Sequence, residues 1–195
     1  MNLRIILFGL LILAQIAVPL RMIQQRETVL REGALFRFKT QPIDPADPFQ
    51  GRYVWLRIKE DYVRLSEVET EAVDYNTRGY ATVSIDEHGF AFFDSWSTER
   101  PTTGGYLKTR ALGQQIEWET LFENERSRMH KGLRIDIPFT RYYMDEAKAP
   151  RAEILARDAS RDDTCWVAVR ILNGQAVIED VMIEGQSIRD LSAVE

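Results

Sequence analysis

Two acidic side chains stand three residues apart in a proline-rich segment. Asp44 and Asp47 lie in the run 42–51, which holds three prolines. Neighbouring carboxylates could bind a hard cation such as calcium, but calcium takes about six to eight oxygen ligands and this segment supplies two carboxylates. Aspartates in such segments commonly cap their own backbone turn. We therefore predict a turn and no metal site, and keep both aspartates as candidate binding residues.

Arginine and aromatic side chains occur together in two segments far apart in the chain. The first supplies Arg52 and Tyr53, and the second supplies Arg141, Tyr142, Tyr143 and Glu146. Aromatic faces with arginines suit sugars, peptides or an anionic partner. Two β-strands would, without any ligand, place the same rings in the core and the same charges in solvent. Strand packing is the simpler interpretation, and the candidate binding set is Asp44, Asp47, Arg52, Tyr53, Arg141, Tyr142 and Glu146.

Residues typical of enzyme centres are sparse. The two histidines are His88, in an expected turn, and His130, in a basic stretch that we interpret as an exposed loop. The single cysteine, Cys165, is expected to be a small buried residue. The sequence has no Gly-x-Ser-x-Gly elbow and no histidine pair spaced for zinc. The pattern favours a binding protein over an enzyme, with no catalytic residue and no cofactor predicted.

The elements that must position these residues begin with an apolar segment. Residues 5–20 carry no charge over 16 positions, and Arg4 and Arg21 flank them. As a helix they would span about 24 Å, against a hydrocarbon core of about 30 Å. The flanking arginines can reach the headgroups and make up the difference. We predict a single-pass transmembrane helix.

A cleaved signal peptide is the alternative interpretation of this segment. Its cleavage site needs two small residues separated by one residue, and Ala17 is preceded at that spacing by Gln15. The sequence therefore favours an uncleaved anchor. The helix is expected to continue through residues 22–32 as a stalk and to end at Gly33, in the left-handed conformation that glycine adopts readily.

Orientation in the membrane rests on two opposing signals. Arg21, Arg26 and Arg31 follow the apolar run, which by the positive-inside rule favours a cytoplasmic position for the remainder. A short basic start followed directly by an apolar run instead resembles an export signal. We favour export, which places the remainder in the periplasm beside the inner membrane.

Composition limits what the remainder binds. The chain of 195 residues has a net charge of -5, and four basic but only two acidic residues lie in its first 32 positions. The remainder is therefore acidic overall, which argues against nucleic-acid binding. Residues 1–32 are predicted as anchor and stalk, and residues 33–195 as one domain, because no linker divides them.

Alternating and β-branched segments predict that this domain is mainly β, an antiparallel α+β fold with one short helix. Strands are expected at 35–40, 53–58, 80–85, 90–93, 106–110, 115–119, 133–137, 166–170, 176–178 and 181–183. Two hairpins are expected, around Gly89 and around Asn173-Gly174, because Asn-Gly favours a type I′ turn. Apolar residues at helical spacing place the short helix between Glu60 and Tyr75.

The run 42–56 resembles the signature of the GDYXXLXY family, which are bacterial membrane-anchored proteins of uncharacterised function. Gly51, Tyr53 and Leu56 match the named motif, whereas Arg52 replaces its Asp and Ile58 replaces its last Tyr. The segment 137–148 is similar to a second block of the family. The resemblance implies a membrane-associated β-rich domain and no established chemistry.

Two functional hypotheses follow. The first is a membrane-anchored accessory protein whose extracytoplasmic domain binds an integral membrane protein or an envelope component, because tethering raises the effective concentration of weak partners. The second is an envelope hydrolase or ligand-binding subunit with a groove near Asp44, Asp47, Arg141 and Glu146.

Overall fold

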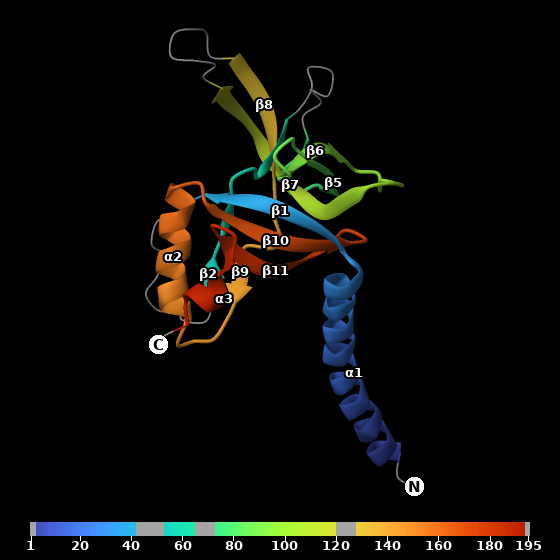
Figure 1. Ribbon diagram of the computed structural model, residues 1–195. Coiled ribbons are helices and arrows are strands. Elements are labelled where there is room, and N and C mark those ends of the chain that lie inside the picture. Colours follow the sequence, from blue (N-terminus) through green and yellow to red (C-terminus); the bar gives the residue numbers. More distant parts are fainter. Residues whose placement is uncertain (1–2, 42–52, 65–72, 120–127, 194–195) are drawn as a thin grey trace.

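The computed structural model describes residues 3–41, 53–64, 73–119 and 128–193, and the predictions for Asp44, Asp47, Gly51 and Arg52 lie outside these ranges. A long helix leads into a β-rich region of strands and two shorter helices (Figure 1). The elements in chain order are α1 (Leu3–Glu32), β1 (Ala34–Gln41), β2 (Tyr53–Trp55), β3 (Arg57–Ile58), β4 (Tyr62–Arg64), β5 (Arg78–Ile85), β6 (Ala91–Ser97), β7 (Gly105–Glu119), β8 (Arg128–Ile135), β9 (Arg141–Tyr143), α2 (Ala149–Arg161), β10 (Cys165–Leu172), β11 (Gln175–Ile183), β12 (Gln186–Ser187) and α3 (Ile188–Leu191).

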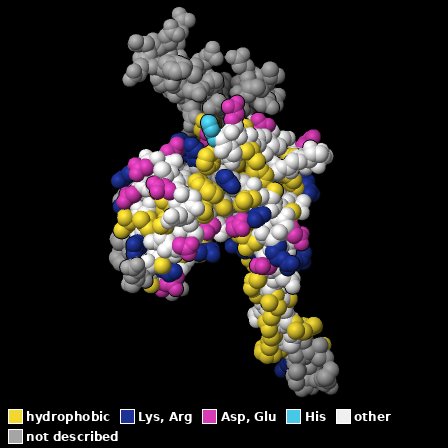
Figure 2. All heavy atoms as spheres, viewed as in Figure 1, with side chains coloured by type: hydrophobic (Ala, Val, Ile, Leu, Met, Phe, Trp, Pro, Cys, Tyr) yellow, Lys and Arg dark blue, Asp and Glu magenta, His cyan; other side chains and the backbone are white. Residues whose placement is uncertain are grey.

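Helix α1 projects from the β-rich region as a rod with an apolar surface (Figure 2). Large apolar side chains between Leu7 and Ile23 are exposed, and Val29, 2% exposed, is buried where the helix meets the β-rich region. The helix is long and apolar enough to cross a membrane. The predicted continuation through the stalk is confirmed, because α1 runs without a break to Glu32.

Gly33 ends α1 as predicted, but for a different reason. It is not among the residues of positive φ. A Cβ at this position would lie 2.4 Å from the carbonyl oxygen of Val29 and 3.1 Å from the Cβ of Arg170. The Arg170 guanidinium also donates a hydrogen bond to the Gly33 carbonyl, at 3.1 Å. Glycine is therefore needed for the close approach of α1 to β10.

Two five-stranded sheets form the body, in the orders β12-β11-β10-β1-β3 and β4-β8-β7-β5-β6. The named strands pair antiparallel throughout the described part of the chain, which confirms a mainly β fold. The sheets share one core, in which the Phe38 ring of β1 lies 5.5 Å from the Phe93 ring of β6 and 5.3 Å from the Phe139 ring. Figure 1 shows β5, β6 and β7 on the opposite side of β1 and β10 from α1.

Both predicted hairpins are confirmed. Strands β5 and β6 join through the turn at Gly89, and β10 and β11 join through Asn173 and Gly174. Asn173 has φ 51° and Gly174 has φ 78°, as a type I′ turn requires. Each hairpin contains a register shift, which lets the strands twist around the core.

Several expected elements are wrong in extent or type. The expected strand 53–58 breaks at Leu56, so that β2 pairs with β9 while β3 pairs with β1. Strand β4 occupies part of the helix expected between Glu60 and Tyr75, and residues 65–72 lie outside the described part. The strands expected at 106–110 and 115–119 are one strand, β7, with a register shift near Gly113. His130 belongs to β8 rather than to a loop.

Helix α2 was not predicted. Its buried face consists of Ala149, Ala152, Ala156 and Ala159, which have helical spacing, together with Ser160. Alanine carries so little apolar surface that this stripe is inconspicuous beside the larger side chains of the strands. The small side chains suit close contact with β1, β2 and β10.

Candidate functional site

The two segments that carry the family resemblance form their own small sheet. Strand β2, from the first block, pairs antiparallel with β9, from the second. Tyr53 lies opposite Tyr143, and Trp55 lies opposite Arg141. Segments almost ninety positions apart in the sequence are thus direct neighbours. Figure 1 shows this pair on the same side of β10 and β11 as α1.

Side chains on one face of this sheet form a cluster that we call the aromatic–arginine face: Tyr53, Trp55, Arg141 and Tyr143. The Arg141 guanidinium carbon lies 5.4 Å from the centre of the Tyr53 ring and 5.5 Å from that of Trp55. The Tyr53 and Tyr143 rings are 5.7 Å apart. Trp55 is 40% exposed and Tyr143 is 62% exposed. The two rings help to hold the arginine in place, and its N–H groups have no hydrogen-bond partner among the described residues.

Tyr142 points the opposite way, into the core, because side chains alternate along a strand. It is 3% exposed. Its hydroxyl donates to Asp180 Oδ1 at 2.8 Å and accepts a hydrogen bond from Arg189 Nε. Burial, followed by the hydrogen bond to Asp180, raises the pKa of Tyr142 well above its usual value. Tyr142 therefore stays neutral and ties β9 to β11 and α3.

A cleft of about 380 Å³ adjoins this sheet, and we call it the arginine cleft. Arg26 of α1, Arg141 of β9 and Arg189 of α3 line it. The other lining residues are Pro138, Phe139, Thr140, Tyr142, Tyr143, Ala176, Val177 and Ile178. No carboxylate is among these residues, and the arginines form no ion pair within the described ranges. Figure 2 shows basic side chains, with some acidic ones among them, where α1 meets the β-rich region.

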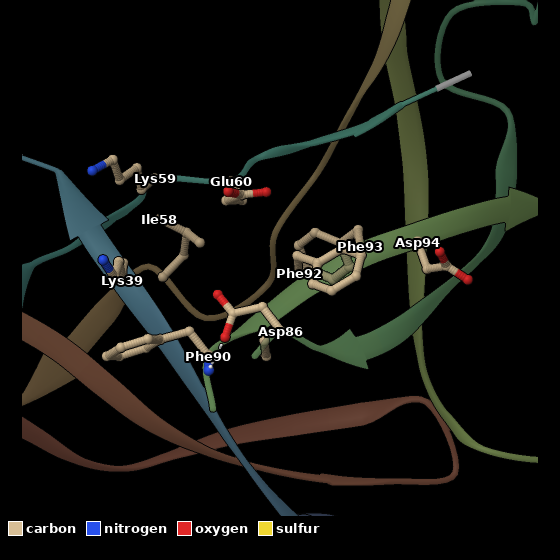
Figure 3. Close-up of a pocket in the computed structure, with 10 residues that line it drawn as sticks. Lys39, Ile58, Lys59, Glu60, Asp86, Phe90, Phe92, Phe93 and Asp94 are labelled. Atoms are coloured by element: carbon tan, nitrogen blue, oxygen red, sulfur yellow. Dashed lines mark hydrogen bonds between the residues drawn. The ribbon is translucent and has the colours of Figure 1, made fainter. Parts of the chain in front are cut away.

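A second hollow of about 380 Å³, the lysine pocket, lies between β1, β3 and β6 (Figure 3). Lys39 and Lys59 line it together with three acidic residues, Glu60, Asp86 and Asp94. Both lysines donate to Asp163, which follows α2, at 3.1 and 2.8 Å. The hydrogen bond from Lys59 is the largest influence that lowers the pKa of Asp163, and Lys39 adds to it.

The structure brings together only part of the predicted binding set. Tyr53 and Arg141 meet on the aromatic–arginine face, and Tyr142 lies behind it. Glu146 is exposed in the segment between β9 and α2. Within the described ranges, no three His, Cys, Asp or Glu side chains lie close enough to hold a metal ion.

Sequence reasoning missed three residues of this region. Trp55 was assigned to a buried strand, but side chains alternate from residue 53 to residue 58, so that Val54, Leu56 and Ile58 are buried and Trp55 faces outward. Arg26 and Arg189 carry no local signal, since they join Arg141 only through the packing of α1 and α3. The pairing of β2 with β9 is the one feature that a comparison of the two motif blocks could have suggested.

The lone cysteine and one histidine lie as predicted. Cys165 is 1% exposed, and burial raises the pKa of its thiol. Beside it, Thr40 donates to the Cys165 carbonyl and shares a 2.8 Å hydrogen bond with Ser160. His88 is exposed in the hairpin turn between β5 and β6.

The motif residues have clear structural roles where they are described. Tyr53 belongs to the aromatic–arginine face, and Leu56 is buried at the strand break, where its N–H donates to the Thr140 carbonyl at 2.8 Å. Ile58, which replaces the last motif tyrosine, is 2% exposed in the core. An apolar side chain is therefore well suited to that position.

Comparison with known proteins gives one match. Searches of curated proteins and of solved structures found none. The family described as GDYXXLXY protein matches residues 15–181, from within α1 to β11. Because the match covers most of the chain and includes both strands of the β2–β9 sheet, this protein belongs to the GDYXXLXY family.

Proposed function

We propose that this protein is a single-pass membrane-anchored binding protein. In this proposal α1 crosses the inner membrane, and the β-rich region presents the aromatic–arginine face to an integral membrane protein from the periplasmic side. The observation that carries the proposal is the exposed contact of Arg141 with the Tyr53 and Trp55 rings, on the side of the body from which α1 emerges.

The exposed surface of α1 supports the anchor. Burying one large apolar side chain is worth about 1.5–3 kcal/mol, and large apolar side chains along the first two-thirds of the helix are unburied. A lipid bilayer would cover these side chains. No face of this rod is covered by the β-rich region until Val29.

The connection between anchor and body supports a fixed position near the membrane. The last turns of α1 pack against β10 and β11, and Arg170 holds the Gly33 carbonyl. Arg170 is held in turn by Glu179, at 2.7 Å. A helical stalk joined in this way keeps the body at a fixed distance from the membrane surface. The effective concentration of any neighbour in the same bilayer is therefore raised.

The residue types of the face support a protein partner. Trp, Tyr and Arg are the side chains that most often dominate binding energy at interfaces. Arg141 is pre-positioned by its two rings, so little side-chain freedom is lost on binding. Trp55 and Tyr143 are exposed and have room to contact a partner.

Photocrosslinking in native membranes tests this proposal. A photoreactive residue at Tyr143 is expected to crosslink one integral membrane protein, and Arg141→Ala should remove that product. The control is a photoreactive residue at Tyr75, which is 75% exposed just before β5. Identical products from both positions, or products that persist in Arg141→Ala, would contradict the proposal.

A reporter at the C-terminus tests the orientation separately. An alkaline phosphatase fusion at Glu195 is expected to be active, because this enzyme matures only outside the cytoplasm. Activity of a cytoplasmic reporter at the same position would overturn the periplasmic assignment.

A further inference from the structure

The arginine cleft combines three cations that no carboxylate of the described residues neutralises. Arg26, Arg141 and Arg189 come from α1, β9 and α3, and none has an ion pair with a described carboxylate. Asp180 lies behind them, where its carboxylate accepts hydrogen bonds from the Tyr142 hydroxyl and from the Val181 N–H. Like charges that converge in a hollow repel one another, and a bound anion would remove that repulsion.

Two of the three arginines are held in place by contacts that leave N–H groups free. Arg141 lies over the Tyr53 and Trp55 rings, contacts that involve no hydrogen bond from the guanidinium. Arg189 donates through Nε to Tyr142 and lies over its ring at 5.3 Å. The outer nitrogens of both have no hydrogen-bond partner among the described residues. A planar fork of N–H donors matches the oxygens of a phosphate group.

The height of the cleft above the bilayer identifies where that phosphate would come from. Arg26 lies five residues beyond Arg21, which closes the apolar run, so it stands about 8 Å further along the helix axis. The polar layer on each side of the hydrocarbon core is about 5–8 Å thick. Arg26 therefore lies at the level of the lipid headgroups when α1 spans the membrane. Ala176, Val177 and Ile178 give the cleft an apolar wall.

We propose that the arginine cleft binds the phosphate group of an anionic phospholipid from the membrane that holds α1. This inference rests on the membrane anchor of the proposed function and is independent of the protein partner. The arginines of the cleft would attract the anionic headgroup locally, although the chain as a whole is acidic.

The test measures lipid binding to the full chain by native mass spectrometry. The protein is released from nanodiscs of phosphatidylcholine with or without phosphatidylglycerol, and retained lipids are counted. One phosphatidylglycerol is expected to be retained in preference to phosphatidylcholine. Arg26→Gln should weaken this retention about tenfold, since the variant loses one charge-assisted hydrogen bond to the phosphate.

Matched variants separate the site from general charge. Arg31→Gln removes the same charge from the same helix outside the cleft, and it should leave retention unchanged. Arg26→Lys keeps the charge but loses the fork, and it should fall between Gln and wild type. Arg26 is exposed and has no described hydrogen-bond partner, so these variants leave the fold intact. Equal losses in Arg26→Gln and Arg31→Gln would overturn the proposal.

Two further measurements identify the source of the phosphate and distinguish failure of the membrane anchor from failure of the lipid site. Inorganic phosphate that displaces phosphatidylglycerol at equal concentration would overturn the lipid assignment in favour of a soluble anion. Alkaline carbonate extraction checks the anchor. A chain that is extracted contradicts the proposed function and this inference together. A chain that stays in the membrane but shows no lipid preference contradicts this inference alone.

Discussion

The arginine cleft and the lysine pocket have the same volume, about 380 Å³, but they differ in the charges of the residues that line them. The two cations of the lysine pocket pair with Asp163, and three further carboxylates line the pocket. In the arginine cleft three cations meet none among the lining residues. The two hollows lie on one body and differ in whether the described residues supply a counter-charge.

The difference indicates which hollow is structural and which is free to bind. Asp163 joins the end of α2 to β1 and β3, so the lysines are used to hold a helix against a sheet. Two arginines of the cleft, Arg141 and Arg189, are held by aromatic rings and a tyrosine hydroxyl, contacts that fix their position without neutralising their charge. Substitutions can test each half of this comparison.

The largest effect is expected from Phe38→Ala, which removes a large ring from the core that lies beside both hollows. Phe38 is fully buried and contacts Phe93 and Phe139, which lie beside the lysine pocket and the arginine cleft respectively. Truncating a buried Phe costs about 3–5 kcal/mol. Urea denaturation should show this loss. A loss below about 1 kcal/mol would show that the two sheets do not depend on one core.

Tyr142→Phe should affect the arginine cleft alone. The variant keeps the ring but leaves Asp180 and Arg189 without their shared hydroxyl. We expect a loss of about 1–3 kcal/mol in the free energy of unfolding, because a buried polar group left without its partner carries its full desolvation cost. Denaturation measured beside wild type checks this value. An unchanged stability would show that Tyr142 does not tie β9 to α3.

Asp163→Asn tests the lysine pocket and should cost less than about 1 kcal/mol, because the ion pairs are exposed. Asp163 has φ 58°, a conformation that Asn also tolerates, so the variant removes only the charge.

The sign of the pH effect follows from the lowered pKa of Asp163. A carboxyl whose pKa is lower when folded stabilises fully above its unfolded pKa, about 3.9. That contribution disappears as the pH falls through the folded pKa. The stability difference between wild type and Asp163→Asn should therefore be constant near neutrality and shrink below about pH 4. A difference that grows on acidification would contradict the ion-pair assignment.

Arg141→Ala should have the smallest effect on stability, about 0.5 kcal/mol, because the contacts of this exposed side chain with the two rings are weak. Its effect on binding should nevertheless be large, since both the crosslink from Tyr143 and lipid retention depend on it. Thermal denaturation and the two binding assays, carried out on the same variant, compare the loss of stability with the loss of binding. A large loss of stability would mean that Arg141 is structural, like Lys59, and would remove the distinction between the two hollows.

Local pattern was sufficient to predict much of the fold. Alternation predicted β1, β5 and β6, and Asn173-Gly174 predicted the turn between β10 and β11. The break at Leu56 was not predictable, because it arises when β2 and β3 pair with different strands. Helix α2 was missed because its buried stripe is alanine, which carries little apolar signal.

The candidate site was only partly predictable, for a related reason. The chemistry of Tyr53 and Arg141 was visible from their types, but their contact depends on the pairing of β2 with β9. Arg26 and Arg189 lie in helices whose sequences give no sign of a shared cleft. Distant segments come together through tertiary packing, and the periodicity of one segment does not predict which other segments it will contact.

The most direct test of the central claim is the depth of the two hollows relative to the bilayer. A fluorophore is attached at Tyr143→Cys, beside the arginine cleft, or at Asp94→Cys, in the lysine pocket, each in a Cys165→Ala background. Quenching by a group attached to lipid headgroups is then measured with the full chain in vesicles. The account predicts strong quenching at position 143 and little at position 94, and equal quenching at both would contradict it.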